Sequence, residues 1–74
     1  MILINHINRE IVIYADRLVT GEVVLRSGQG RVICRKAFRE QSLIHVSAQS
    51  AGKGMIRVTV RTEEESKEKT FQIQ

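Results

Sequence analysis

The chain has 74 residues, with 12 Lys and Arg against 8 Asp and Glu for a formal net charge of +4, and only 4% of its residues are aromatic. A chain this short forms one domain with a small core, which argues against a self-contained enzyme. Its single cysteine excludes an internal disulfide, and the opening "MILINHIN" is too short and too interrupted by polar residues for a signal peptide or a membrane span.

Apolar and polar residues alternate with a period of two in several segments, and this pattern is typical of strands that pack one face against a core. After "ILINHI", a candidate first strand, "REIVIYA" places Ile11 and Ile13 on one face. In "GEVVLRS", Val23 and Leu25 form the inward face. Because helical periodicity fails along the chain, we expect strands and not helices.

Two segments rich in small residues separate the strands that follow. "SGQG" at 27–30 supplies two glycines for a tight hairpin, so we expect Gly28 and Gly30 to form the turn that leads into "RVICRKA". The strand "SLIHVSA" comes next, with Ile44 and Val46 on one face. "AQSAGKG" then predicts a loop.

The final segment, "GMIRVTVRTEEESKEKTFQIQ", predicts a β-hairpin. Its first arm, "MIRVTVRT", alternates strictly, and its second arm, "KEKTFQI", turns Phe71 and Ile73 inward. "EEES" is too charged for a core and forms the tip. On the outer face, Arg57 and Arg61 would lie near Glu68 or Glu65, a cross-strand attraction of about 0.2–1 kcal/mol. A helix over "RTEEESKEK" is the alternative, although no apolar stripe crosses it.

These segments predict six or seven strands in a single domain over residues 1–74. A sheet with one polar, solvent-exposed face and one apolar face must cover its apolar face with a second layer. We therefore expect an all-β fold, a small antiparallel β-sandwich of the immunoglobulin-like kind.

Residues that carry chemistry are few and scattered. His6 and His45 lie far apart, and no pair of His or Cys residues has the short spacing of zinc ligands, so we expect no metal site and no cofactor. A thiol–imidazole pair of Cys34 and His45 would need an exposed, electropositive pocket. Cys34 instead alternates with apolar residues and is expected to be a small buried side chain. We therefore expect no catalytic residues.

The order of the segments resembles one known family, the C-terminal domain that serves as sorting signal for the type IX secretion system of Bacteroidota. The resemblance covers nearly the whole chain. "REIVIYA" matches the family's first strand, and "GEVVLRSGQGRVI" matches its second strand and turn, with Gly30 at the matching glycine. Gly54 with "MIRVTV" and the lysine-containing "KEKTFQIQ" match the closing strands. Ser27 and Ile56 depart from the pattern, standing where the family favours Asp and an aromatic residue.

The resemblance implies that the domain is the C-terminal portion of a longer secreted protein. Such domains direct a cargo protein from the periplasm across the outer membrane. A sortase-like cysteine peptidase then removes the domain and joins the cargo to anionic lipopolysaccharide at the cell surface. The translocon and its shuttle proteins would add a strand to the free edge of the last strand. The alternative is that the last strand only completes the hydrophobic core and contacts no partner. The expected recognition residues are Gly54, Lys69, Phe71, Gln72, Ile73 and Gln74.

Two other functions stay open at this level. An accessory immunoglobulin-like module of a surface enzyme or adhesin would bind carbohydrate or protein with no role in sorting. A nucleic-acid-binding β-barrel is suggested only by the basic charge and would want exposed aromatic residues for stacking, so we expect no nucleic-acid partner. Exposed strand edges would also permit a homodimer.

Overall fold

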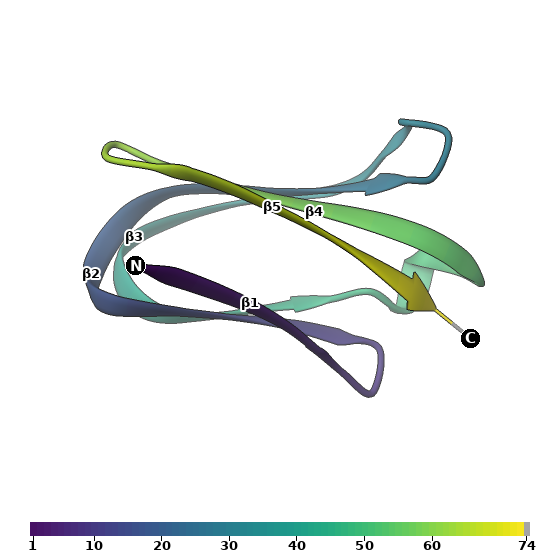
Figure 1. Ribbon diagram of the computed structural model, residues 1–74, viewed down its shortest axis with the longest axis horizontal. Helices are drawn as coiled ribbons and strands as arrows, with labels where there is room; N and C mark the ends of the chain where they lie inside the picture. The colour runs from purple at the N-terminus through teal and green to yellow at the C-terminus, as the bar shows by residue number, and fades with distance from the viewer. Residues whose placement is uncertain (74) are drawn as a thin grey trace.

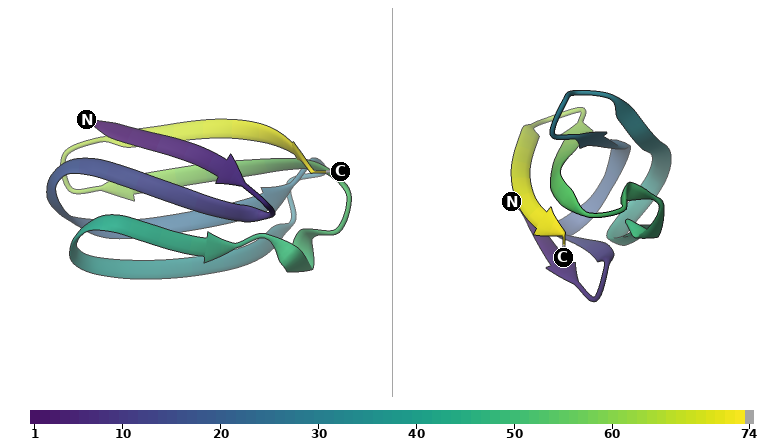
Figure 2. Two further views of the ribbon diagram at one scale, coloured as in Figure 1. Left: turned by 90° about the horizontal axis from the view of Figure 1, so that it is seen from below. Right: turned by 90° about the vertical axis from the view of Figure 1, so that its right-hand side faces the viewer.

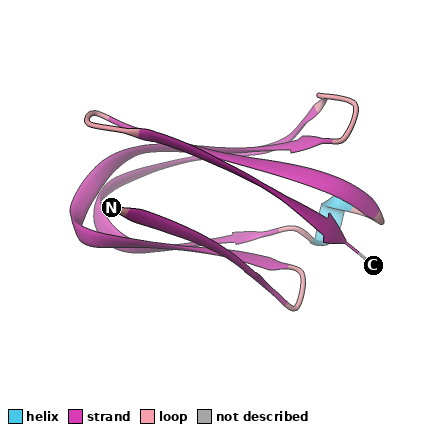
Figure 3. Ribbon diagram, in the orientation of Figure 1, coloured by secondary structure: helices cyan, strands magenta, loops and turns pink. Residues whose placement is uncertain are grey.

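The computed structural model describes residues 1–73 and confirms the all-β prediction (Figure 1, Figure 3); Gln74, one of the expected recognition residues, lies outside them. The described chain contains β1 (Ile2–Ile7), β2 (Glu10–Ser27), β3 (Val32–Ser47), a short 3-10 helix η1 (Gln49–Ala51), β4 (Gly54–Thr62) and β5 (Ser66–Ile73). All strand pairs are antiparallel. There are five strands and not six or seven, because β2 and β3 each join two of the expected strands.

The long strands β2 and β3 bend, and each contributes to both layers of the fold. The first part of β2 lies between β1 and the last part of β3, whereas its second part lies between the first part of β3 and β4. β5 extends the second layer beyond β4. Seen along its long axis, the sheet curls around its interior and brings β5 next to β1 (Figure 2). Closure into an immunoglobulin-like sandwich stays a prediction.

Irregular strand pairing accompanies the bend. The register between β2 and β3 shifts between Tyr14 and Val19 and again between Val19 and Gly21, and bulges of this kind bend and twist a strand. On β3, Glu40 has a left-handed φ of 48°, and its backbone N–H donates a hydrogen bond to Oγ1 of Thr20 at 3.0 Å. The bend is therefore a backbone feature, and the alternation of side chains does not reveal it.

Gly21 is a point of very close backbone approach beside the bend. It pairs with Phe38 of β3 on one side and with Thr62 of β4 on the other. A Cβ atom at this position would lie 2.0 Å from the backbone carbonyl oxygen of Arg61. Only a residue without a side chain fits this contact. Gly21 is not among the glycines that were expected to form turns.

The inward faces of both layers pack into one core, and the inward positions predicted from alternation are buried there, with the exceptions of Phe71 and Cys34. Phe71 and Cys34 pack against this core from partly buried positions. Its buried members are Ile2, Ile4, Ile11, Ile13, Val23, Leu25, Phe38, Ile44, Val46, Ala48, Ile56, Val58, Val60 and Ile73.

Gly28 and Gly30 lie in the turn that joins β2 to β3, and the Ser27 hydroxyl organises that turn. Oγ of Ser27 accepts hydrogen bonds from the backbone N–H groups of Gln29 (3.3 Å) and Arg31 (3.2 Å). An Asp carboxylate would accept the same bonds, so the departure at Ser27 keeps the turn chemistry. Gly30 has a left-handed φ of 90°, whereas Gly28 is not left-handed, so only Gly30 uses the freedom that both were expected to supply.

The acidic "EEES" segment forms the tip of the β4–β5 hairpin, so the helical alternative is wrong. Oγ1 of Thr62 accepts hydrogen bonds from the backbone N–H groups of Glu64 (3.3 Å) and Glu65 (3.1 Å). On the outer face, the guanidinium group of Arg57 lies 3.7 Å from the carboxylate of Glu68, which confirms the expected cross-strand attraction for Arg57. Within the described residues, Arg61 forms no such pair with Glu65 or Glu68. An exposed pair of this kind stabilises the fold only slightly.

Candidate functional site

The expected recognition residues within residues 1–73 lie on the β4–β5 hairpin. Gly54 opens β4 with a left-handed φ of 116° and pairs with Ile73. Lys69 and Gln72 are exposed and Phe71 is half-buried, whereas Ile73 is only 1% exposed. A partner would therefore reach Lys69 and Gln72 directly, while Ile73 belongs to the core.

β5 is an edge strand of the sheet. Within residues 1–73, its backbone forms a ladder with β4 alone, and its other side faces β1 without strand pairing. Residues directly opposite each other across two strands share a face. Lys67 and Lys69 stand opposite the buried Val60 and Val58. The alternation that turns Phe71 inward therefore also aims both lysines inward at this edge.

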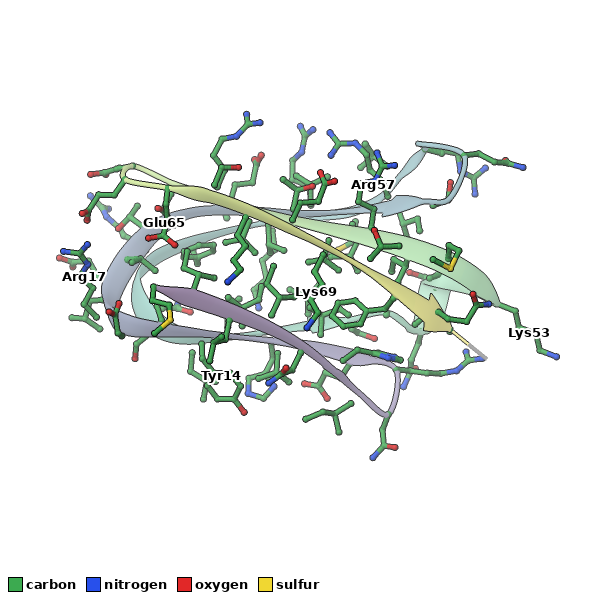
Figure 4. All side chains as sticks on the ribbon, in the orientation of Figure 1. Tyr14, Arg17, Lys53, Arg57, Glu65 and Lys69 are labelled. Atoms are coloured by element: carbon green, nitrogen blue, oxygen red, sulfur yellow. The ribbon has the colours of Figure 1, made fainter. Side chains whose placement is uncertain are left out.

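The two lysines bridge the gap between β5 and β1. Nζ of Lys67 donates a hydrogen bond to the backbone carbonyl oxygen of Ile2 at 2.7 Å, and Nζ of Lys69 donates one to that of Ile4 at 3.3 Å. Figure 4 shows Lys69 between the two strands. Each aliphatic stem covers apolar surface while the ammonium group finds an acceptor. We call this gap the β1–β5 seam; it is bounded by Ile2, Ile4, His6, Lys67, Lys69 and Phe71.

A ring contact also joins the two sides of the β1–β5 seam. The ring centroids of His6 and Phe71 lie 5.5 Å apart with the planes tilted by 48°. Nζ of Lys69 lies 5.4 Å from the centroid of the Phe71 ring, within the range of a cation–π interaction. Nε2 of His6 is buried and has no hydrogen-bond partner among the described residues. A buried nitrogen left unpaired costs about 1–3 kcal/mol, so the seam is packed but incompletely satisfied.

Lys67→Met is expected to loosen β1 from β5, because it keeps the apolar stem and removes the donor to the Ile2 carbonyl group. The free energy of unfolding should fall by about 1–2 kcal/mol. Amide hydrogen exchange in β1 should become faster. Lys53→Met is the matched control, since Lys53 is exposed in the loop before β4 (Figure 4). Equal exchange rates in β1 for the two variants would contradict the bridging role of Lys67.

A row of exposed apolar side chains crosses the outer face of the first layer. Tyr14 of β2 stands directly opposite Leu3 of β1 on one side and Leu43 of β3 on the other. Their exposed fractions are 40%, 50% and 47% respectively. Contiguous exposed apolar residues mark interaction surfaces. The alternation that turns Ile13 and Ile44 inward turns the adjacent Tyr14 and Leu43 outward, but only the strand register makes the three exposed residues neighbours.

Cys34 and His45 lie apart. Nδ1 of His45 lies 2.6 Å from Oε1 of Glu10 on an outer face, whereas Cys34 is a free thiol that packs partly buried against the core. Within residues 1–73, no group of three His, Cys, Asp or Glu side chains is placed to hold a metal ion. The same residues include no helix that is long and apolar enough to span a membrane.

An ionic contact at the start of β1 shifts two titrations. The Met1 amino group donates a hydrogen bond to Oδ1 of Asp16 at 2.8 Å. This bond raises the pKa of the amino group and lowers the pKa of the Asp16 carboxyl below its usual value. The same amino group lies 3.7 Å from the carboxylate of Glu65 at the β4–β5 tip. Because these contacts are solvent-exposed, they stabilise the fold only slightly. Their main effect is to position the start of β1.

Comparison with known proteins found no protein-family model and no curated protein that matches the chain significantly. The candidate site therefore rests on the geometry of the β1–β5 seam and on the residues of the family resemblance.

Proposed function

We propose that this chain is a sorting-signal domain of the type IX secretion system and that the secretion machinery recognises the β5 side of the β1–β5 seam. The observation that supports this proposal is that, within residues 1–73, the β5 backbone is unpaired on the side that faces β1. The β5 backbone pairs with β4 alone, and two lysine side chains, not a neighbouring strand, hold its far side. An edge of this kind is where a partner adds a strand of its own.

Recognition would begin when the lysine amino groups leave the β1 carbonyl groups. Each bridge contributes about 1–2 kcal/mol, less than a paired strand would, so a partner strand can replace the bridges at a small cost in free energy. The backbone N–H and C=O groups of β5 would then pair with the partner, and the exposed side chains of Lys69 and Gln72 would add contacts. Phe71 and Ile73 would hold the strand in place from the core side.

In this proposal the domain crosses the periplasm attached to its cargo and engages the shuttle proteins and the translocon at the outer membrane. A sortase-like cysteine peptidase would then exchange the domain for anionic lipopolysaccharide, leaving the cargo at the cell surface or secreted. In this proposal the domain serves only as a recognition signal and supplies no catalytic group to the peptidase reaction.

The proposal is tested by fusing the domain behind a periplasmic reporter in a bacterium that has a type IX system. Lys69→Ala should reduce surface delivery of the reporter several-fold, and Lys53→Ala should leave it unchanged. Because the Lys69 hydrogen bond is long, at 3.3 Å, the purified variant should melt within about 8 °C of the parent domain. Parental delivery by both Lys69→Ala and a fusion without residues 66–74 would exclude the sorting role. A large fall in both delivery and melting temperature would indicate that Lys69 acts through stability.

The row formed by Leu3, Tyr14 and Leu43 favours a second candidate, an accessory module that binds protein or carbohydrate. An accessory module predicts that delivery of the reporter is independent of β5. It also predicts that Tyr14→Ser with Leu43→Ser abolishes target binding by the parent protein. The β5 variants of the export assay therefore separate the two functions.

A further inference from the structure

A small hollow lies on the outer face of the second layer, away from the β1–β5 seam. Val24 of β2 and Thr59 of β4 are directly opposite each other and form its floor, because their side chains are shorter than those around them. Three guanidinium groups and one carboxylate surround this floor, from Arg26, Arg35, Arg61 and Glu22. The hollow is therefore lined mainly by positive charge.

The positive charge on this face is only partly compensated. Arg35 and Arg57 each lie near one carboxylate, at 3.8 and 3.7 Å. Arg26 and Arg61 form no ion pair within residues 1–73. Arg26 also stands directly opposite Arg57 across β2 and β4, an arrangement that destabilises a sheet. Figure 4 shows Arg57 on the outer side of the ribbon, away from the core.

We propose that this arginine face, formed by Arg26, Arg35, Arg57 and Arg61, binds phosphate esters, with one phosphate group seated in the hollow between Arg26 and Arg61. A guanidinium group presents paired N–H donors that match the oxygens of a phosphate. An anion in the hollow would also give Arg26, which stands opposite Arg57, an attractive partner. The site is independent of the proposed sorting function, because it shares no residue with the β1–β5 seam.

The side chains around the hollow favour phosphate over nucleic-acid bases as the recognised group. No residue that lines the hollow is aromatic, so a base finds no ring on which to stack. The phosphate could belong to a soluble compound or to a lipid headgroup. Single-stranded nucleic acid is the competing ligand and is included in the test.

The experiment compares three probes on the intact domain. Inorganic pyrophosphate is titrated while backbone amide resonances are followed by NMR, and we expect the largest changes at Val24 and Thr59. Vesicles of phosphatidylcholine with and without phosphatidic acid test a lipid headgroup by co-sedimentation. A single-stranded DNA oligonucleotide tests the competing ligand.

The deciding variant replaces both Arg26 and Arg61 with Gln and should weaken phosphate binding about tenfold or more. The matched control replaces Arg39 and Lys53 with Gln, because both are exposed, form no ion pair within residues 1–73 and give the same change in charge. Both variants should melt within a few degrees of the parent, because all four substitutions avoid the core.

The results of the three probes decide whether the hollow binds phosphate and which kind of phosphate compound it binds. Binding of pyrophosphate alone would assign a soluble phosphate compound, and binding of phosphatidic acid vesicles alone would assign a lipid headgroup; either result supports the site if the deciding variant loses it. Three results would overturn it: no binding of either phosphate probe, an equal loss in the control variant, or tighter binding of the oligonucleotide than of both phosphate probes.

Discussion

Gly21→Ala is expected to lower the melting temperature by about 15 °C or more, because the added Cβ atom has no space. It would lie 2.0 Å from the Arg61 carbonyl oxygen, which is backbone and held by the β2–β4 ladder. Relief of that contact requires β4 to move away from β2, and such overpacking costs about 3 kcal/mol or more. This is a large share of the free energy of unfolding of globular domains, which is about 5–15 kcal/mol. Thermal unfolding followed by circular dichroism measures the change.

Gly28→Ala is the matched control for this prediction. Its added Cβ atom would lie 3.4 Å from Cβ of Met55, an ordinary contact distance. Gly28 also lacks a left-handed φ, so alanine adopts its backbone conformation without strain. A melting temperature close to that of the parent is expected. Similar effects of the two substitutions would show that close approach at Gly21 is unimportant.

Leu25→Ala is expected to lower the free energy of unfolding by about 2–5 kcal/mol, because it leaves a cavity in the core. Leu25 is fully buried on the central strand and stands opposite Cys34 of β3 and Val58 of β4. Neighbours on both sides are fixed by strand pairing and have little freedom to fill the space. Urea unfolding should show a lower midpoint with an unchanged slope.

Leu18→Ala makes the same chemical change at a residue that is 65% exposed near the bend. Its effect should stay within about 0.5 kcal/mol. The difference between the two leucines therefore measures burial and not helix or strand preference. Equal midpoints for the two variants would contradict the assignment of Leu25 to the core.

Much of the fold could be predicted from the sequence because strand alternation is a local property. The inward positions Val23, Ile44 and Val58 follow from their immediate neighbours, and all three are buried. The same alternation, continued from Phe71 through Lys69 to Lys67, would have placed both lysines on the inward face. The family resemblance assigned Lys69 to contact with a partner instead, and no local rule shows that an open edge lets both lysines reach the carbonyl groups of β1.

The two surface features depended on strand register. Leu3, Tyr14 and Leu43 come from three strands, and their adjacency follows only from the pairing of β2 with both β1 and β3. The arginine face combines β2, β3 and β4 in the same way. Neighbours across strands are set by backbone ladders, and a single sequence does not encode these ladders as a short-range pattern.

Three features depend only on residues close together in the chain and can therefore be read from the sequence. They are the period-two alternation, the glycine and hydroxyl groups at the turns, and the acidic hairpin tip. The bends of β2 and β3, the need for glycine at position 21 and the β1–β5 seam arise where distant segments meet. They depend on bulges and on the space left between backbones, which exist only once the sheet has curled. The candidate site belongs to this second group, because the β1–β5 seam joins the two ends of the described chain.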